Sequence, residues 1–267
     1  RGPSSIRSLH AHNERTTAIR VYLINPRNPL AGLTDLKRSR WNRYRVWKPL
    51  GLLTLAALTP AEWQITIFDE NIRMPEYEKL PRPDLVGVTA FTSQAPRAYE
   101  IAAIWRQRGV RVVMGGIHAT MRRHESAEHV DAVVTGEAET VWPRLLEDFG
   151  RGALRPLYEG GQEDLRRSRP ARHDLLSGKY SFGAIQTTRG CPHDCEFCTV
   201  TAYYGNTFRR RPLETLRREL EAFSRSYLFV VDDNIIGTGQ KAGASYHIMD
   251  PAGRASPDSP HGPEDRA

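Results

Sequence analysis

The stretch Thr187-Thr-Arg-Gly-Cys-Pro-His-Asp-Cys-Glu-Phe-Cys198 holds every cysteine of this 267-residue chain. Cys191, Cys195 and Cys198 follow a CxxxCxxC spacing. Three thiolates hold three corners of a [4Fe–4S] cluster and leave the fourth iron open to a substrate or cofactor, whereas four thiolates close the cluster for electron transfer. The spacing therefore predicts an iron–sulfur cluster at which chemistry takes place.

Two other uses of cysteine fit this loop less well. A disulfide framework needs an even number of cysteines in a secreted chain, but here the number is odd and no apolar signal segment opens the sequence. A structural zinc site needs a fourth ligand, and His193 would have to bend back from inside the loop to supply it. The cluster is therefore the favoured interpretation.

The segments around the loop predict a β-loop-α-β unit. Residues 180–188 are typical of a strand, and a second short strand at 227–231 ends in three polar residues. Between them a helix is predicted behind Pro212, with apolar residues at helical spacing at Leu213, Leu216, Leu220 and Phe223. The cysteine loop then lies at the carboxyl end of the first strand, where (β/α) barrels carry their active sites.

The loop resembles the signature of the radical S-adenosylmethionine (SAM) superfamily, CxxxCxΦC, with Phe197 as the aromatic residue before the last cysteine. The resemblance implies that Cys191, Cys195 and Cys198 bind a [4Fe–4S] cluster whose open iron chelates SAM. It also implies that Phe197 packs near the adenine. No catalytic residue is assigned beyond the cluster ligands.

Further SAM contacts are implied at the end of the second strand. Asp232, Asp233 and Asn234 occupy the place from which family members contact the amino group of SAM, although the more usual Gly-Gly-Glu is absent. The assignment among the three stays open, and a plain strand-to-helix turn is the alternative. For residues 209–211, which are all arginine, contact with the SAM carboxylate is the alternative to an exposed loop.

Ahead of this unit, five short apolar runs alternate with helical stretches at 19–24, 64–68, 84–89, 110–114 and 131–135. Such alternation predicts a parallel sheet wrapped by helices, a doubly wound sheet of flavodoxin-like order. One predicted helix carries Ala98, Ile101, Ala102 and Trp105 on one face, and Gly109 is placed to end it.

Ligands of such sheets bind beyond the carboxyl ends of the strands, where this chain has small and polar residues. They are Thr89, Thr92 and Ser93 after the third run, Gly115, Gly116 and His118 after the fourth, and Gly136 and Glu137 after the fifth. Together with residues 48–57, these loops resemble the cobalamin-binding domain found upstream of many radical SAM barrels. The resemblance implies that they hold cobalamin. No dinucleotide or Walker phosphate-binding motif is present to favour another nucleotide.

The predicted fold is thus α/β, a flavodoxin-like (Rossmann-like) cobalamin-binding domain followed by the start of a radical SAM (β/α) partial barrel. We expect an irregular arm at 1–18, the cobalamin domain at 19–150, a linker at 151–179, the first part of the barrel at 180–237 and a disordered or non-native tail at 238–267. A barrel of this type needs on the order of 200 residues. The chain is therefore expected to be a fragment of a longer enzyme.

The run at 189–202 is similar to the radical SAM group that contains hopanoid methylases. This resemblance implies a cobalamin-dependent enzyme in which a 5′-deoxyadenosyl radical removes a substrate hydrogen and methylcobalamin supplies a methyl group to an unactivated carbon. A polycyclic lipid is one substrate class, and an external electron donor is implied. Cyclisation, methylthiolation and a non-catalytic cofactor-binding module are the alternatives.

Composition limits the choice of partners and compartment. The formal net charge of +7 comes largely from arginine clusters at 38–45, 166–172 and 209–211, which are more typical of solvated faces than of a nucleic-acid interface. No run of eighteen apolar residues occurs that could span a membrane. An oxygen-sensitive cluster and reduced thiols favour a cytoplasmic location.

We predict that cobalamin bound to this chain lacks a protein imidazole on cobalt. Many cobalamin domains carry D-x-H-x-x-G after the first strand, but here the loop reads Asn25-Pro-Arg-Asn-Pro-Leu-Ala-Gly32. His118 is the nearest alternative, for which a hydrogen-bonding role is the simpler interpretation. The EPR spectrum of bound cob(II)alamin should show no nitrogen superhyperfine splitting from the protein, and such splitting would contradict the prediction.

Overall fold

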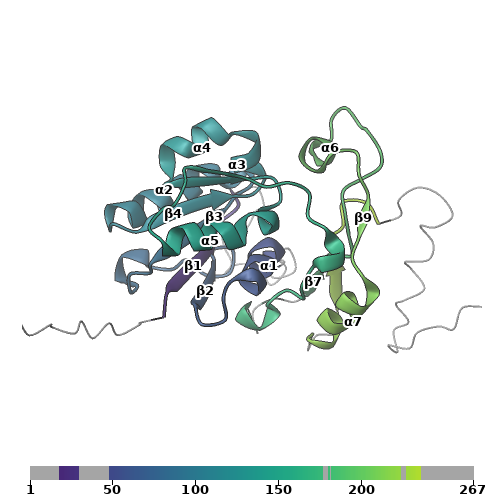
Figure 1. The fold of residues 1–267 in the computed structure, drawn as a ribbon, viewed down its shortest axis with the longest axis horizontal. Coiled ribbons are helices and arrows are strands. Elements are labelled where there is room, and N and C mark those ends of the chain that lie inside the picture. Colours follow the sequence, from purple (N-terminus) through teal and green to yellow (C-terminus); the bar gives the residue numbers. More distant parts are fainter. Residues whose placement is uncertain (1–17, 30–47, 177–179, 181, 224–226, 236–267) are drawn as a thin grey trace, which may run out of the picture.

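The computed structural model describes residues 18–29, 48–176, 180, 182–223 and 227–235. Its largest element is a parallel sheet of six strands in the order β2-β1-β3-β4-β5-β6 (Figure 1). The strands are β1 (Arg20–Asn25), β2 (Gln64–Asp69), β3 (Leu85–Thr89), β4 (Arg111–Gly115), β5 (Ala132–Thr135) and β6 (Leu157–Glu159). This is the flavodoxin-like order that the sequence predicts.

The five expected strands all form, each within one residue of its predicted bounds. The sixth, β6, was not expected, because it is only three residues long and lies in the segment 151–179 that was interpreted as a linker. It pairs in parallel with β5, and its middle residue Tyr158 is buried. The sheet therefore extends beyond residue 150.

Helices cover both faces of the sheet because alternate residues of each strand point to opposite sides. On one face Tyr22 and Ile24 of β1 pack with α2 (Ala95–Gln107) and α3 (Ile117–Met121). On the other, Val21 and Leu23 pack with α1 (Leu50–Leu58) and α5 (Trp142–Gly150). The short helix α4 (Arg123–His129) follows α3 and packs near α2.

The helix α2 confirms the predicted apolar face. Ala98, Ile101, Ala102 and Trp105 are fully buried, and Trp105 meets the rings of Tyr22 and Tyr77 edge-on. The helix ends where expected, since Gly109 has φ of 70°, a left-handed conformation that glycine adopts without strain.

The rest of the chain forms a smaller unit beside the carboxyl edge of the sheet (Figure 1). Strands β7 (Gly183–Ile185) and β10 (Leu228–Val230) pair in parallel, and α7 (Leu213–Glu221) lies between them in sequence. The predicted single strand at 180–188 is interrupted, because its last residues belong to β8 (Thr188–Arg189), which pairs antiparallel with β9 (Arg209–Arg210). A short helix, α6 (Thr199–Tyr204), follows the cysteines.

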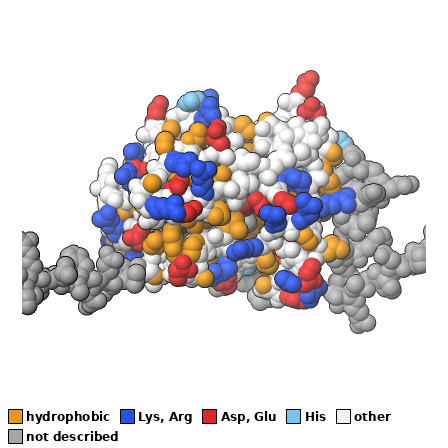
Figure 2. Space-filling model, in the orientation of Figure 1, with side chains coloured by type: hydrophobic (Ala, Val, Ile, Leu, Met, Phe, Trp, Pro, Cys, Tyr) orange, Lys and Arg blue, Asp and Glu red, His pale blue; other side chains and the backbone are white. Residues whose placement is uncertain are grey.

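The described residues also contain the 3-10 helices η3 (Tyr77–Lys79), η4 (Thr92–Gln94), η5 (Ala138–Thr140), η6 (Leu165–Arg167) and η7 (His173–Leu176). The expectations for the N-terminal arm and for the tail after residue 237 fall outside the described residues, apart from residue 18. Among the described residues, no helix is both long and apolar enough to cross a membrane. Figure 2 shows basic side chains dispersed among acidic ones over the face it presents, in keeping with solvated charge.

A buried carboxyl group joins the two units. Asp69 at the end of β2 accepts a hydrogen bond of 2.7 Å from the hydroxyl of Tyr180, which precedes β7. The side-chain amides of Asn25 and Asn71 donate to its other oxygen at 3.1 and 2.8 Å. Burial raises the pKa of Asp69 above its ordinary value even though these hydrogen bonds act to lower it.

Because the pKa of Asp69 is raised, we predict that this residue lowers the free energy of unfolding as pH rises. The folded state holds the proton to a higher pH than the unfolded chain, where aspartate ionises near pH 4, so stability is lost as pH rises from about 4 through the folded pKa. In Asp69→Asn the amide oxygen can still accept from both asparagines, and the amide nitrogen can donate to Tyr180. The wild type should therefore lose stability relative to Asp69→Asn over this window, as measured by urea unfolding at several pH values.

Asp164→Asn is the matched control, because the contribution of Asp164 to stability should change with pH in the opposite direction. The pKa of Asp164 is lowered because Arg166 donates to its carboxylate, so its contribution grows as pH rises. An equal pH dependence of wild type and Asp69→Asn would rule out the assigned role of Asp69.

Candidate functional site

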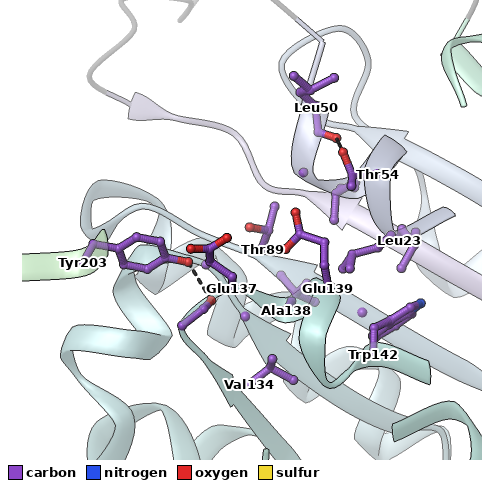
Figure 3. A pocket seen from close by; sticks show the side chains of 18 of the residues that line it. Leu23, Leu50, Thr54, Thr89, Val134, Glu137, Ala138, Glu139, Trp142 and Tyr203 are labelled. Carbon is purple, nitrogen blue, oxygen red and sulfur yellow. Dashed lines mark hydrogen bonds between the residues drawn. The ribbon is translucent and has the colours of Figure 1, made fainter. Parts of the chain in front are cut away.

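A cavity of about 220 Å³ lies at the carboxyl ends of the central strands, between the sheet and the smaller unit. Its walls on the sheet side come from β1, β3, β4, β5, α1 and η5, and Figure 3 shows these side chains gathered around it. The smaller unit contributes Gln186, Arg189, Tyr203, Tyr204 and Val231. A ligand in this cavity would therefore contact both units.

The floor of the cavity is apolar and includes a glycine. Leu23, Val113, Val134 and Trp142 line it, and Gly87 lies among them on β3. A Cβ atom at Gly87 would approach Leu23 Cδ2 to 2.9 Å. The absence of a side chain there leaves room for Leu23, which itself lines the cavity.

Two glycines at the rim adopt conformations that other residues rarely take. Gly116 has φ of 92° and Gly136 has φ of 65°. At Gly136 a Cβ would lie 2.2 Å from the carbonyl oxygen of Gly160, which is backbone and cannot swing aside. The glycine signal read from the sequence thus has a steric cause at both positions.

The predicted cobalamin contacts divide into two groups. The structure brings Thr89, Gly115, Gly116, Gly136 and Glu137 together at the cavity. The other three, Thr92, Ser93 and His118, are not among the residues that line it. Ser93 instead donates to the side-chain oxygen of Asn28 at 3.0 Å.

His118 is held inside a hydrogen-bonded cluster. Its Nε2 lies 2.7 Å from the hydroxyl of Tyr99, and its Nδ1 lies 3.3 Å from the hydroxyl of Thr92. The side chain is buried, and burial lowers its pKa. This environment favours the hydrogen-bonding interpretation of His118 over a role as a cobalt ligand.

The three cysteines lie as free thiols in one loop at the edge of the smaller unit. Cys195 is exposed and the other two are half-buried. The backbone N–H of Cys198 donates to the carbonyl of Cys195 at 2.9 Å, and the side-chain amide of Asn234 lies 3.4 Å from the sulfur of Cys191. The described residues contain no group of three or more His, Cys, Asp or Glu side chains arranged for a metal ion, so joint coordination stays a prediction.

The acidic residues predicted to contact SAM support the base of this loop. Asp232 accepts from the backbone N–H of Thr187 at 2.6 Å, and Asp233 accepts from that of Gly190 at 3.1 Å. Burial raises the pKa of Asp233. The fourth predicted SAM residue, Phe197, is 91% exposed.

Of the arginines at 209–211, the first two form β9 and the third follows it, and all three take part in interactions with the protein. Arg209 forms an ion pair with Glu137, and Arg211 forms one with the fully buried Glu219 at 2.5 Å. The Arg210 guanidinium lies over the Phe208 ring. These contacts replace the exposed loop that was one of the two expectations.

Four polar cavity residues of the smaller unit were not predicted: Gln186, Arg189, Tyr203 and Tyr204. The hydroxyl of Tyr203 donates to the carbonyl of Gly136 at 2.7 Å (Figure 3), and burial raises the pKa of Tyr203 to about 12. The available signal was their closeness in sequence to the cysteines, with Arg189 just before them and the tyrosines just after. Sequence alone could not show that this segment turns toward the sheet.

Residues 41–146 match the family model described as the B12 binding domain. The chain contains a B12-binding domain. The matched range begins before α1, ends within α5 and includes the ends of β3, β4 and β5 at the cavity. It also includes all eight residues predicted to contact cobalamin.

Curated relatives of this chain include methyltransferases. It is 33% identical over 193 residues to bacteriochlorophyllide d C-8(2)-methyltransferase of Chlorobaculum tepidum, an alignment covering 67% of this chain and 41% of the relative. It is 29% identical over 203 residues to hopanoid C-2 methylase of Rhodopseudomonas palustris, covering 73% of this chain and 38% of the relative. The chain thus spans about two fifths of the length of these relatives.

Solved structures share the fold. The cobalamin-dependent SAM radical enzyme OxsB superposes with a TM-score of 0.66 at 14% identity, covering 86% of this chain and 36% of OxsB. The radical SAM methyltransferase TsrM of Kitasatospora setae gives 0.59 at 18% identity, covering 82% and 50%. The predicted fold class and the resemblance to B12-binding radical SAM proteins, hopanoid methylases among them, are confirmed.

The B12-binding domain should be sensitive to a side chain at Gly136. Gly136→Ala places a Cβ in a left-handed conformation, at a cost of roughly 1–2 kcal/mol, and against the Gly160 carbonyl. We expect a lower free energy of unfolding and weaker binding of hydroxocobalamin, measured by urea unfolding and by absorbance titration.

Gly150→Ala is the matched control, because an added Cβ there meets nothing within 4 Å. Its stability and binding should stay close to those of the wild type. Equal stability of Gly136→Ala and wild type would contradict the steric argument.

Proposed function

We propose that this chain binds cobalamin in the cavity and, as part of a longer radical SAM enzyme, serves methyl transfer to an unactivated carbon. The observation that carries the proposal is the shared cavity. It joins the strand ends of the B12-binding domain to the segment that carries the three cysteines.

The cavity suits one end of a large cofactor. Its volume of about 220 Å³ is below the roughly 300–1,000 Å³ of pockets that enclose a whole drug-sized ligand. An apolar floor under Gly87 and polar groups at Thr89 and Glu139 on its walls suit a planar ring with polar substituents. We therefore assign this space to the nucleotide end of cobalamin.

The cysteine loop suits a [4Fe–4S] cluster by its donor set. Three free thiols from one short loop match the three-cysteine ligation that leaves an iron open. The Asn234 amide beside the Cys191 sulfur adds a hydrogen bond of the kind that tunes a cluster. On this proposal Cys191, Cys195 and Cys198 hold the cluster, and Phe197, Asp232, Asp233 and Asn234 are the candidates nearest to SAM.

When bound, these cofactors supply radical hydrogen abstraction and a transferable methyl group. The chain's own residues orient them. Tyr203 and Tyr204 close the cavity on the side of the cysteines, and Asp232 and Asp233 fix the start of the loop. A reducing compartment would keep these thiols free, in keeping with a cytoplasmic location. Radical chemistry at the cluster would also need an external electron donor.

The substrate class is proposed from the relatives. A hopanoid methylase and a bacteriochlorophyllide methyltransferase are among them, which supports a large polycyclic molecule such as a polycyclic lipid. Mass spectrometry of products from the full-length enzyme would distinguish methylation from cyclisation or methylthiolation.

The cluster assignment predicts the effect of removing one thiol. After anaerobic reconstitution with iron and sulfide, the wild type should bind about four irons per chain and show visible cluster absorbance. Cys195→Ala should lose both, because two thiols cannot retain the cluster. Binding of hydroxocobalamin should persist in the variant, since the cavity floor belongs to the sheet.

His193→Ala is the matched control within the same loop and should keep the cluster. If His193 were instead a zinc ligand, His193→Ala would lose the bound metal. Retained absorbance in Cys195→Ala would overturn the ligand assignment. With a reductant and SAM, release of 5′-deoxyadenosine supports the radical reaction, and its absence from the full-length enzyme would favour a binding module without turnover.

A further inference from the structure

The three cysteines lie on an excursion of the chain that leaves the fold at β8 and returns at β9. Residues 190–208 form this excursion, which contains α6 as well as the cysteine loop. Its two ends are neighbours, because Arg189 and Arg209 are directly paired across the antiparallel strands. Two like charges in this position repel each other unless a counter-charge lies between them.

Glu137 supplies that counter-charge from the B12-binding domain. Its carboxylate accepts from Arg189 at 2.5 Å and from Arg209 at 3.1 Å, and its second oxygen pairs with Arg209 as well. The side chain of Glu137 is only 4% exposed. Glu139 accepts from Arg189 at 2.8 Å, so two carboxylates balance two guanidinium groups.

A third contact ties the middle of the excursion to the same loop. Tyr203 on α6 donates to the carbonyl of Gly136, the residue before Glu137. A Cβ at Gly136 would meet the carbonyl of Gly160, and a Cβ at Gly160 would meet the carbonyls of Glu137 and Thr135, so neither position accommodates a side chain. Residues 136–137 therefore form a fixed point that contacts the excursion at both ends and in the middle.

These contacts leave Glu137 little capacity to bind a ligand directly. Both oxygens accept from arginine, and one also accepts from the backbone N–H of Glu163 at 3.2 Å. Arg209 in turn depends on Glu137 and on the carbonyl of Glu163, because its Nε is buried without a hydrogen-bond partner in the described structure. Loss of the carboxylate would leave the largely buried Arg209 without a carboxylate partner and Arg189 with Glu139 alone.

We infer that Glu137 is a positioning residue, which holds the cysteine-bearing excursion against the B12-binding domain and couples it to the occupancy of the cavity. The coupling rests on the proposed binding of cobalamin, because Glu137, Arg189 and Tyr203 all line that cavity. The holding role does not depend on it.

Hydrogen exchange of the protein without cofactors tests the holding role. In Glu137→Gln, amides of residues 190–210 should exchange at least tenfold faster than in wild type, while those of β3 and β4 should be unchanged. Glu147→Gln is the matched control, because Glu147 forms an exposed ion pair with Arg151 on α5. It should leave exchange at 190–210 unaltered.

Unchanged exchange at 190–210 in Glu137→Gln would overturn the inference. If Glu137→Gln fails to fold, Tyr203→Phe tests whether residues 136–137 hold the excursion, because this variant removes one hydrogen bond and no charge. It should speed exchange by several-fold in residues 199–208 alone, and no change there would equally overturn the inference.

Adding hydroxocobalamin, at concentrations that absorbance shows to saturate each protein, tests the coupling. It should slow exchange at 190–208 in wild type, and this effect should be lost in saturated Glu137→Gln. The same protection in both proteins would overturn the coupling. No binding to the wild type would refute the proposed cofactor, yet the cofactor-free comparison would still decide the holding role.

Discussion

The site depends on the parallel direction of the strands. Because β1, β3, β4 and β5 all run the same way, their carboxyl ends meet at one edge, and the loops that follow them lie next to each other. Residues separated by tens of positions in sequence, such as Thr89 and Gly136, line one cavity for this reason. The smaller unit rests on that same edge, so the cavity has two sides.

Backbone constraints then determine how closely the loops and the smaller unit can approach. At Gly87 and Gly136 the missing side chain is a requirement of packing, because neighbouring atoms fill the space that a Cβ would take. Two buried carboxyl groups at this edge have different partners. The buried carboxyl of Asp69 faces a tyrosine hydroxyl, whereas the carboxylate of Glu137 faces two arginines. Burial raises the pKa of Asp69, whereas the carboxylate of Glu137 balances buried positive charge.

Much of the fold could be predicted from sequence because its signals are local. Apolar runs marked five strands, and the spacing from Ala98 to Trp105 marked α2. The strand β6 was not predicted, because three residues carry no periodic signal and its place in the sheet depends on pairing with β5. The strand predicted at 180–188 was continuous in pattern, but it divides where Arg189 must pair with Arg209.

The site was predictable in part for the same reason. Glycine and threonine after strand ends are local signals, and five of the eight residues read this way reach the cavity. The other three depend on where side chains turn, as His118 turns toward Tyr99. Tyr203 and Tyr204 could not be assigned because their role exists only once two distant segments dock.

The contacts of residues 136–137 with positions 189, 203 and 209 have a consequence for how such proteins can recombine. A B12-binding sheet of this kind is not a freely exchangeable module. The loop after β5 and the cysteine-bearing segment have to come from the same parent protein, so that their contacting residues match. A chimera joined between them would keep both folds and lose the alignment of one with the other.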